Sequence, residues 1–355
     1  MKLLHAADLH LDSPFRGLSA QQALVRRGEL RDIPARLVQL ARAEQVDLVL
    51  LPGDLFDSQR PTPQGLAALK DALDAMSVPV CIAPGNHDYY HSDSPYAGEW
   101  PDNVHIFTTQ ELTEVSLPVL NCVVHGCAFT APHRESSPLD GFTAPQDGKL
   151  HLLCVHGELA PSGRYAPITL QNLADVQAHY VALGHIHFNS GLRQEGSTYW
   201  AYPGCPEGRG FDELGRKGAL VVELAHGQAS AQFHPLCHRQ YRIERVSPAQ
   251  LPQAMEGWPG EDLVRILLTG ESEHAPDLAA LTASAAQRFF YAEVRDETTL
   301  PQALWAREDE DSLTGLFLRE MRRRLHNASP EEQSTLLLAT RFGLSALEGG
   351  EDIRP

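Results

Sequence analysis

Polar side chains that could bind metal ions follow five apolar segments of this chain. The segments KLLHAADLH, LVLLPGDLFD, CIAPGNHD, LLCVHG and VALGHIH end in Asp8, His10, Asp54, Asn86, His87, His156, His185 and His187. In open α/β sheets, sites form beyond the carboxyl ends of the strands, so converging strand ends would gather these side chains. A mixed set of nitrogen and oxygen ligands of this size suits two adjacent divalent transition metals.

The ligand types also indicate which metals to expect. Imidazole and carboxylate groups together favour Mn, Fe, Zn or Co over Ca or Mg, and we expect Mn first. The pairs Asp8-x-His10 and His185-x-His187 each keep both side chains on one face of a strand end. A single His after a strand is more often a hydrogen-bonded core or surface residue, and Gly-Asp is a common turn. The ordered set, rather than any one motif, therefore predicts the two-metal site.

Strands and helices must alternate to bring these ends together. Apolar runs predict strands at 2–8, 46–54, 78–86, 104–107, 121–126, 150–157, 179–185, 197–204 and 218–224. Apolar spacing near 3.6 residues predicts helices at 19–44 and 63–76. This alternation predicts an α/β sheet, and the later strands follow one another without obvious helices. We therefore expect two sheets packed as a β-sandwich and flanked by helices.

The pattern changes after Val246. Residues 247–262 look like a linker or a crossing into a cap, and a strand (262–270), a helix (277–290) and a strand (290–296) predict a small α+β unit. Two further helices are expected, one at about 312–325 and one that opens at Ser329 with a capping-box acid. No catalytic cluster is visible in this region of the sequence.

Composition limits the classes of protein. The chain has 355 residues and 43% hydrophobic residues, which suggests two domains, or one large domain with an appendage. It has no run of eighteen apolar residues and no N-terminal signal pattern, so we expect a soluble, cytoplasmic protein with no membrane segment. Its six cysteines form no CxxC framework, which fits a reduced compartment and argues against a structural zinc site of cysteines.

The net charge argues against broad electrostatic binding of nucleic acid. The formal charge is −17, whereas proteins that hold DNA by their own surface normally show a basic patch. A nucleic-acid substrate would have to be held locally, through metal ions, or with help from a partner.

The ordered motifs DxH, GDxxD, GNHD, VHG and GHxH resemble those of the calcineurin-like metallophosphoesterase superfamily over about residues 1–240. The resemblance implies one metal held by Asp8, His10, Asp54 and His187, and a second held by Asp54, Asn86, His156 and His185. Asp54 would bridge the two metals. His87 would be no ligand but would protonate the leaving oxygen or stabilise the transition state. Asp88 would close the turn or orient His87.

Longer motifs narrow the resemblance. HAADLHLDSPFRGL, PGNHDYY, GHIH and YPGCPEGRGFDELGRKG (202–218) are similar to SbcD-type DNA repair nucleases, with the YhaO-like branch closest. This family implies DNA as substrate and an SMC-like ATPase partner of the SbcC or YhaN type. It also implies a homodimer through helices around 63–76 and 88–100. The implied order is a nuclease domain (1–244), a small capping domain (245–299) and a helical segment (300–355) that docks on the partner.

Three loop residues are further candidates for substrate binding. Arg209 could reach a phosphate, or it could pair with Glu207, Asp212 or Glu213 beside it. His133 and Arg134 could contact a phosphate backbone, or they could lie in an ordinary solvated loop. Asp57 is interpreted as a residue that supports the ligands or closes a turn, and His5 as structural.

Three functions therefore compete. The first is a metal-dependent DNA exonuclease or endonuclease that works with an ATPase. The second is a phosphoesterase for a small molecule, a nucleotide or a phosphoprotein, which the acidic charge favours. The third is a non-enzymatic binding subunit, against which the intact set of metal residues argues.

Overall fold

The computed structural model describes residues 1–225 and 227–347. The chain divides into two compact units, Met1–Gln240 and Tyr241–Pro355. The expected segments 245–299 and 300–355 therefore both lie in the second unit, which begins a few residues before the expected boundary. No helix among the described residues is long and apolar enough to cross a membrane.

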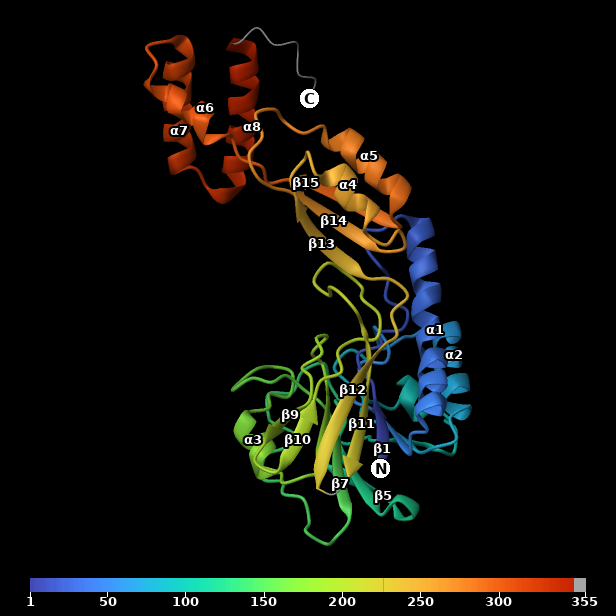
Figure 1. The fold of residues 1–355 in the computed structure, drawn as a ribbon. Coiled ribbons are helices and arrows are strands. Elements are labelled where there is room, and N and C mark those ends of the chain that lie inside the picture. Colours follow the sequence, from blue (N-terminus) through green and yellow to red (C-terminus); the bar gives the residue numbers. More distant parts are fainter. Residues whose placement is uncertain (226, 348–355) are drawn as a thin grey trace. The chain divides into compact units, whose positions relative to one another are not determined.

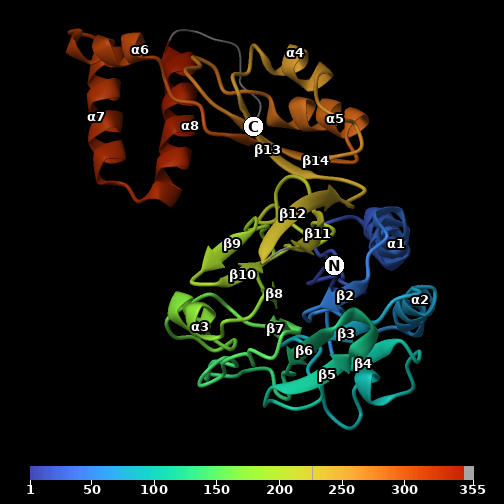
Figure 2. The ribbon, with the colours of Figure 1, turned by 60° about the horizontal axis from the view of Figure 1, so that its bottom comes forward.

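The first unit is built from two six-stranded mixed sheets, as predicted (Figures 1 and 2). The first sheet has the order β12 (Gln228–Pro235), β11 (Gly218–Ala225), β1 (Lys2–His5), β2 (Leu48–Leu51), β3 (Val80–Ile82) and β4 (Val104–Ile106). The second has the order β5 (Thr113–Leu117), β6 (Cys122–Gly126), β7 (Leu150–His156), β8 (Tyr180–Gly184), β10 (Thr198–Ala201) and β9 (Arg193–Glu195). Strands β1 to β4 are parallel, and so are β6, β7, β8 and β10. Their carboxyl ends consequently share one edge in each sheet.

Alternating side chains explain the layers. In β2, Leu48 and Leu50 belong to the core between the two sheets, whereas Val49 and Leu51 face the helices on the other side. Helices α1 (Ala20–Glu44) and α2 (Pro63–Asp74) cover that outer face, and α3 (Leu170–Asp175) packs on the outer face of the second sheet. The short 3₁₀ turns η1 (Pro95–Ala97) and η2 (Pro118–Leu120) lie in the connections. All of these central strands are buried on both faces, so they carry continuous apolar runs.

Local capping fixes where the two long helices begin. Ser19 and Gln22 form a capping box at the start of α1, and the Thr62 hydroxyl accepts the N–H of Gly65 at the start of α2. Asp12 also accepts the N–H and hydroxyl of Thr62, at 2.7 and 2.9 Å. The loop after β1 is thereby tied to the start of α2.

The second unit opens with a three-stranded parallel sheet of order β13 (Tyr241–Val246), β14 (Leu263–Leu268) and β15 (Tyr291–Asp296). Helices α4 (Leu251–Glu256) and α5 (Leu278–Arg288) pack on it, and Val246, Leu251, Ile266 and Ala285 lie in their shared core. Of the two interpretations of 247–262, the linker is wrong, because this stretch contains α4 and crosses from β13 to β14. This helix buries only Leu251 and Met255, which is too short a pattern to show a helical period.

Helices form the rest of this unit. They are α6 (Gln302–Ala306), the 3₁₀ turn η3 (Arg307–Asp309), α7 (Leu313–Asn327) and α8 (Pro330–Leu347). Both helices expected here are confirmed, and α7 and α8 pack side by side through Leu318 and Leu344 (Figures 1 and 2). The Cβ of any larger residue at Gly343 would lie 2.2 Å from the ring of Phe317, so the two helices approach closely there.

Candidate metal centre

The carboxyl ends of β1, β2, β3, β7 and β8 bring the eight expected residues together. Hydrogen bonds tie these loops to one another, since Asp8 N donates to Gly53 O at 3.0 Å and His10 N to Asp54 O at 2.9 Å. The N–H of His185, at the end of the second sheet, donates to Asp8 Oδ1 at 3.0 Å. The two sheets therefore share one site at their common edge.

The backbone is strained at four of these positions. The φ angles of Asp8, His10, Asp54 and His185 are 54°, 46°, 51° and 102°. Residues other than Gly rarely adopt positive φ angles. Such strain costs about 1–3 kcal/mol per residue and persists where the surrounding structure holds it, typically at functional sites. The turns that aim these side chains inward are therefore features of the site.

Asp8, His10 and His187 form a first cluster. One ligand atom from each lies within 4.8 Å of the others. The Nε2 atoms of His10 and His187 are 3.1 Å apart, and His10 Nε2 lies 3.8 Å from Asp54 Oδ2. Two imidazole nitrogens aimed at one another at this distance are arranged as donors to a shared cation.

Asp54, His156 and His185 form a second cluster, again with ligand atoms within 4.8 Å. Asn86 completes it, because its Oδ1 lies 3.1 Å from both His156 Nε2 and His185 Nδ1. His156 Nε2 lies 3.5 Å from Asp54 Oδ2, the same oxygen that approaches His10. Asp54 is therefore common to both clusters, in the position of a bridging carboxylate.

The electrostatics of the site fit two divalent cations. Burial lowers the pKa of His156 and of His185 to about 4, so both are neutral and present lone pairs. Burial also raises the pKa of Asp8 to about 8, so a cation bound beside this carboxylate would favour its charged form. His10 Nδ1 is buried without a hydrogen bond to any described residue. Calcineurin-like phosphoesterases bind two divalent metals, and this donor set suits them.

Close backbone approaches leave no room for side chains around Asp54. A Cβ on Gly85 would lie 2.2 Å from Asp54 Oδ1, and one on Gly184 would lie 1.8 Å from Pro52 O. The glycines of the GNHD and GHxH motifs are therefore needed so that the loops of the two sheets can meet.

His87 lies at the border of the site and differs from its neighbours in being exposed. Its N–H donates to Asp54 Oδ1 at 2.9 Å, its Nδ1 lies 3.1 Å from Asp57 O, and its ring lies 4.8 Å from the ring of His10. One of its nitrogens also falls within 4.8 Å of donors from His10 and Asp54. This geometry suits a group that reaches substrate, and it also allows metal contact.

Asp88 joins two turns of the site by hydrogen bonds. Its buried carboxylate accepts the N–H groups of Leu55 at 2.7 Å and Gly85 at 2.8 Å, and the hydroxyl of Tyr96 at 2.5 Å. It thus closes the PGNHD turn, as expected, and joins that turn to the loop after β2.

Sequence reasoning missed the role of Glu213. This carboxylate is 5% exposed and accepts the Nδ1–H of His187 at 2.7 Å. Lys217 Nζ donates to His187 O at 2.9 Å from the same loop. Burial alone would raise the pKa of Glu213, but the hydrogen bond from His187 and the charge of Arg209 hold it well below its usual range. The only signal in the sequence was the 202–218 motif, which carries no periodicity.

Arg209 forms ion pairs with acidic residues beside the first cluster. Its Nη2 donates to Glu213 Oε1 at 2.8 Å and its Nη1 to Asp57 Oδ1 at 3.2 Å. Of the two interpretations of Arg209, the contacts favour the internal ion pair. Asp57 in turn lies 3.5 Å from His10 Nδ1, so Asp57, Arg209 and Glu213 together surround both histidines of the first cluster.

The other two loop candidates lie near the second cluster. Arg134 Nη1 donates to Gln110 O at 2.7 Å, which directs this guanidinium to a neighbouring loop. His133 is exposed, and its ring lies 5.5 Å from that of Tyr165. The ring of Tyr165 lies 4.9 Å from that of His185.

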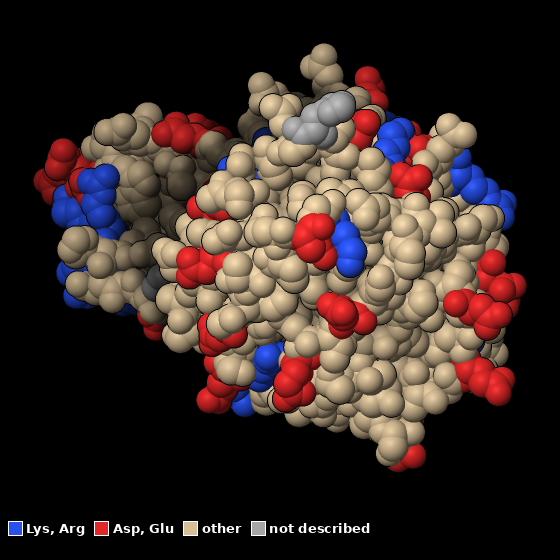
Figure 3. Space-filling model, turned by 90° about the horizontal axis from the view of Figure 1, so that it is seen from below, with Lys and Arg blue, Asp and Glu red and all other residues tan. Residues whose placement is uncertain are grey.

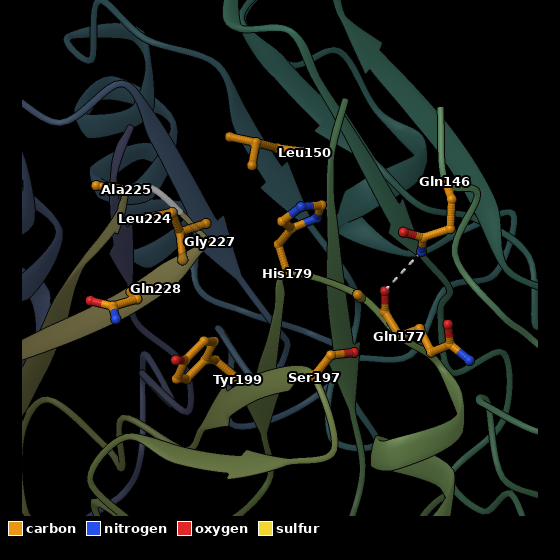
Figure 4. A pocket seen from close by; sticks show the side chains of 11 residues that line it. Gln146, Leu150, Gln177, His179, Ser197, Tyr199, Leu224, Ala225, Gly227 and Gln228 are labelled. Carbon is orange, nitrogen blue, oxygen red and sulfur yellow. Dashed lines mark hydrogen bonds between the residues drawn. The ribbon is translucent and has the colours of Figure 1, made fainter. Parts of the chain in front are cut away.

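A separate pocket lies at the opposite ends of the same strands (Figure 4). Its lining includes Leu150, at the start of β7, and His179, just before β8. Strand β7 rises about 3.3 Å per residue, so the seven residues from Leu150 to His156 separate this pocket from the metal centre by about 20 Å. The pocket is therefore not part of the candidate site.

Comparison with known proteins is consistent with this geometry. The family model of calcineurin-like phosphoesterases matches residues 1–189, more than half of the chain. The metallophosphoesterase YhaO of Bacillus subtilis is 32% identical over 246 residues, covering 66% of this chain and 60% of its own length. The SbcD component of the nuclease SbcCD from Staphylococcus epidermidis is 23% identical over 274 residues, covering 66% of this chain and 70% of its own.

Solved structures resemble the chain more distantly. A dimetal phosphatase from Danio rerio is 14% identical, covering 64% of this chain and 93% of its own, with a TM-score of 0.43. TT1561 of Thermus thermophilus is 11% identical, covering 65% and 98%, with a TM-score of 0.41.

Proposed function

Because this chain belongs to the calcineurin-like phosphoesterase family, we propose that it is a two-metal phosphodiesterase that cleaves DNA as an exonuclease or endonuclease. The observation that carries the proposal is Asp54 Oδ2, which approaches His10 of one cluster at 3.8 Å and His156 of the other at 3.5 Å. A carboxylate in this position supplies the negative charge that holds two cations close together.

The proposed ligands follow from the two clusters. Asp8, His10, Asp54 and His187 would hold one ion, and Asp54, Asn86, His156 and His185 the other, with Mn²⁺ as the first choice. Two such ions, when bound, activate a water and neutralise charge on phosphate oxygens. Two of its imidazoles, His10 and His156, are buried, and burial lowers the pKa of both, so interactions with a phosphate on that side act in a water-poor environment.

His87 is proposed to serve the substrate. It is exposed at the border of the pair, and its backbone N–H donates to Asp54 Oδ1, so the loop position is fixed while the side chain remains open to solvent. A histidine there is placed to donate a proton to the leaving oxygen as a general acid.

DNA is the proposed substrate because of the likeness to the SbcD component of a nuclease and because of the second unit. A small-molecule enzyme has no need of the α7–α8 pair, whose Leu313, Leu316 and Leu338 are exposed. We propose that these residues dock on an SMC-like ATPase of the SbcC or YhaN type. On the face that Figure 3 shows, Lys and Arg side chains are scattered among Asp and Glu and form no broad basic surface among the described residues, so a partner that helps to hold DNA fits this charge.

A nucleotide or other small phosphoester is the second candidate substrate. The net charge of −17 favours it, because such a substrate needs no extended basic surface. The proposed metal centre could hydrolyse either a DNA phosphodiester or a small phosphoester.

One experiment separates the candidates. Purified protein with Mn²⁺ is given end-labelled linear DNA and, separately, bis(p-nitrophenyl) phosphate. The nuclease proposal predicts cleavage of both, lost together in Asp54→Asn and retained in the matched variant Asp74→Asn, whose carboxylate is exposed at the end of α2. Cleavage of the chromogenic diester alone would favour the small phosphoester, and cleavage of neither would contradict the phosphodiesterase itself.

A further inference from the structure

Two paired loops lie beside the second cluster and are not accounted for by the metal ligands. Residues 131–134 and 163–166 are joined by hydrogen bonds from Arg134 N to Arg164 O at 2.9 Å and from Ala166 N to Arg134 O at 2.7 Å. Tyr165 N donates to Glu158 Oε1 at 3.1 Å, and Glu158 N donates back to Tyr165 O at 2.9 Å. The backbone of Tyr165 is therefore fixed on both sides.

Strain in this loop indicates that the position of Tyr165 is specified. Ala166 has a φ of 52°, a conformation that costs an alanine about 1–2 kcal/mol, because its Cβ approaches the carbonyl oxygen that follows. The surrounding hydrogen bonds maintain it. Strain of this kind next to a reaction centre commonly accompanies a group that must be held in place for function.

The side chain of Tyr165 is turned toward the reaction centre. Its ring centroid lies 4.9 Å from that of His185, at an interplanar angle of 33°, and the residue is half-buried. The exposed ring of His133 lies 5.5 Å from it on the other loop. The Tyr165 hydroxyl makes no hydrogen bond with the described residues, so the ring itself is what this position presents.

The chemistry of this wall suits a nucleobase. An aromatic face accepts any base by stacking, which gives sequence-tolerant binding of unpaired nucleotides. A base is separated from its own phosphate only by the sugar, so a phosphate at the second cluster would place a neighbouring base within reach of Tyr165. Arg164, exposed in the same loop, adds a positive charge in an otherwise acidic chain.

We propose that Tyr165, backed by His133, is a stacking site for the unpaired base of a nucleotide attached to the scissile phosphate. This inference rests on the proposed function and deepens it, because it assigns the substrate at the metal centre to nucleic acid with a frayed or single-stranded end. The competing role is structural, in which Tyr165 only orients His185 for metal binding.

The test uses dinucleoside phosphates, which need no partner to hold them. Four substrates are compared: both bases present, the 5′ base replaced by hydrogen, the 3′ base replaced by hydrogen, and both replaced. The kcat/KM of each is measured by chromatography for wild type, Tyr165→Ala, Tyr165→Phe and the matched control Tyr199→Ala. Tyr199 lines the pocket at the other end of the sheets (Figure 4).

The proposal predicts that Tyr165→Ala lowers kcat/KM about 5- to 150-fold for substrates that carry one particular base, the range expected for one stacked base. The same variant leaves the substrate without that base unchanged. Tyr165→Phe keeps the ring and matches wild type, Tyr199→Ala changes nothing, and bound Mn²⁺ in Tyr165→Ala, measured by atomic emission, equals that of wild type.

Other outcomes overturn the proposal in distinguishable ways. Equal losses on all four substrates together with lost Mn²⁺ would show the structural role. No loss in Tyr165→Ala, while wild type still cleaves the dinucleotides, would refute the stacking site and leave the nuclease proposal standing. If wild type hydrolyses bis(p-nitrophenyl) phosphate but none of the four substrates, both proposals fail.

Discussion

Removing the Glu213 carboxylate should weaken one metal site selectively. In Glu213→Gln the neutral amide replaces the charged acceptor of the His187 Nδ1–H, which is 2.7 Å away. A hydrogen bond to a charged group contributes about 1.5–3 kcal/mol. At about 1.4 kcal/mol per tenfold change, that range corresponds to about 10- to 100-fold in affinity, the usual effect of losing a carboxylate that orients a metal-binding histidine.

The loss of affinity should affect the metal ion at the first cluster, because Glu213 contacts the proposed ligand His187 there. The hydrogen bonds of the second cluster run instead through Asn86 and the carbonyl of Pro52, which lies 2.9 Å from His156 Nδ1. Titration of apoprotein with Mn²⁺, followed by electron paramagnetic resonance of the free ion, resolves two affinities. Glu213→Gln should lower one by about 10- to 100-fold and leave the other close to that of wild type.

The neighbouring Asp212 is the matched control. It is exposed, whereas Glu213 is buried, so Asp212→Asn should bind both ions as wild type does. Unchanged affinities in Glu213→Gln, or an equal loss at both sites, would refute the reasoning that Glu213 acts through His187.

Three further predictions concern other parts of the chain. His87→Ala should keep both Mn²⁺ ions but lower kcat on the chromogenic diester about 10²- to 10⁴-fold, and loss of an ion would make His87 a ligand. Burial lowers the pKa of His5 to about 3, so as pH falls below about 6.5 the unfolded chain gains a proton that the folded chain does not. Stability should therefore fall by about 1.4 kcal/mol per pH unit toward pH 3, and His5→Gln should remove that part of the slope in urea titrations of apoprotein; an unchanged slope would contradict it. Leu316→Ser on α7 should abolish co-purification with the proposed SMC-like ATPase while leaving diester hydrolysis intact, and retained binding would refute the proposed docking surface.

The candidate metal centre could be predicted from sequence because parallel strands bring its residues together. Each proposed ligand lies within a few residues of a strand end, and these ends must share an edge. The apolar runs of β1, β2, β7 and β8 and the capping box of α1 are local patterns, so the sandwich and its helices could also be predicted.

Features built by long-range contacts could not be predicted in the same way. Glu213 lies 26 residues after His187 in the sequence, beyond β9 and β10, and Tyr165 reaches His185 from a loop without apolar periodicity. Helix α4 has too few turns to show a helical period. Strand β13 was not predicted, because its sequence YRIERV is not a continuous apolar run. In each case contacts with residues distant in the sequence, and not the local pattern, determine the structure.

The most direct test of the two-metal centre is anomalous diffraction from crystals grown with Mn²⁺. We expect two manganese peaks about 3.5–4 Å apart, one on each side of the Asp54 carboxylate. The first peak should contact Asp8, His10 and His187, and the second should contact Asn86, His156 and His185. A single peak, or two peaks that do not share Asp54, would contradict the two-metal centre.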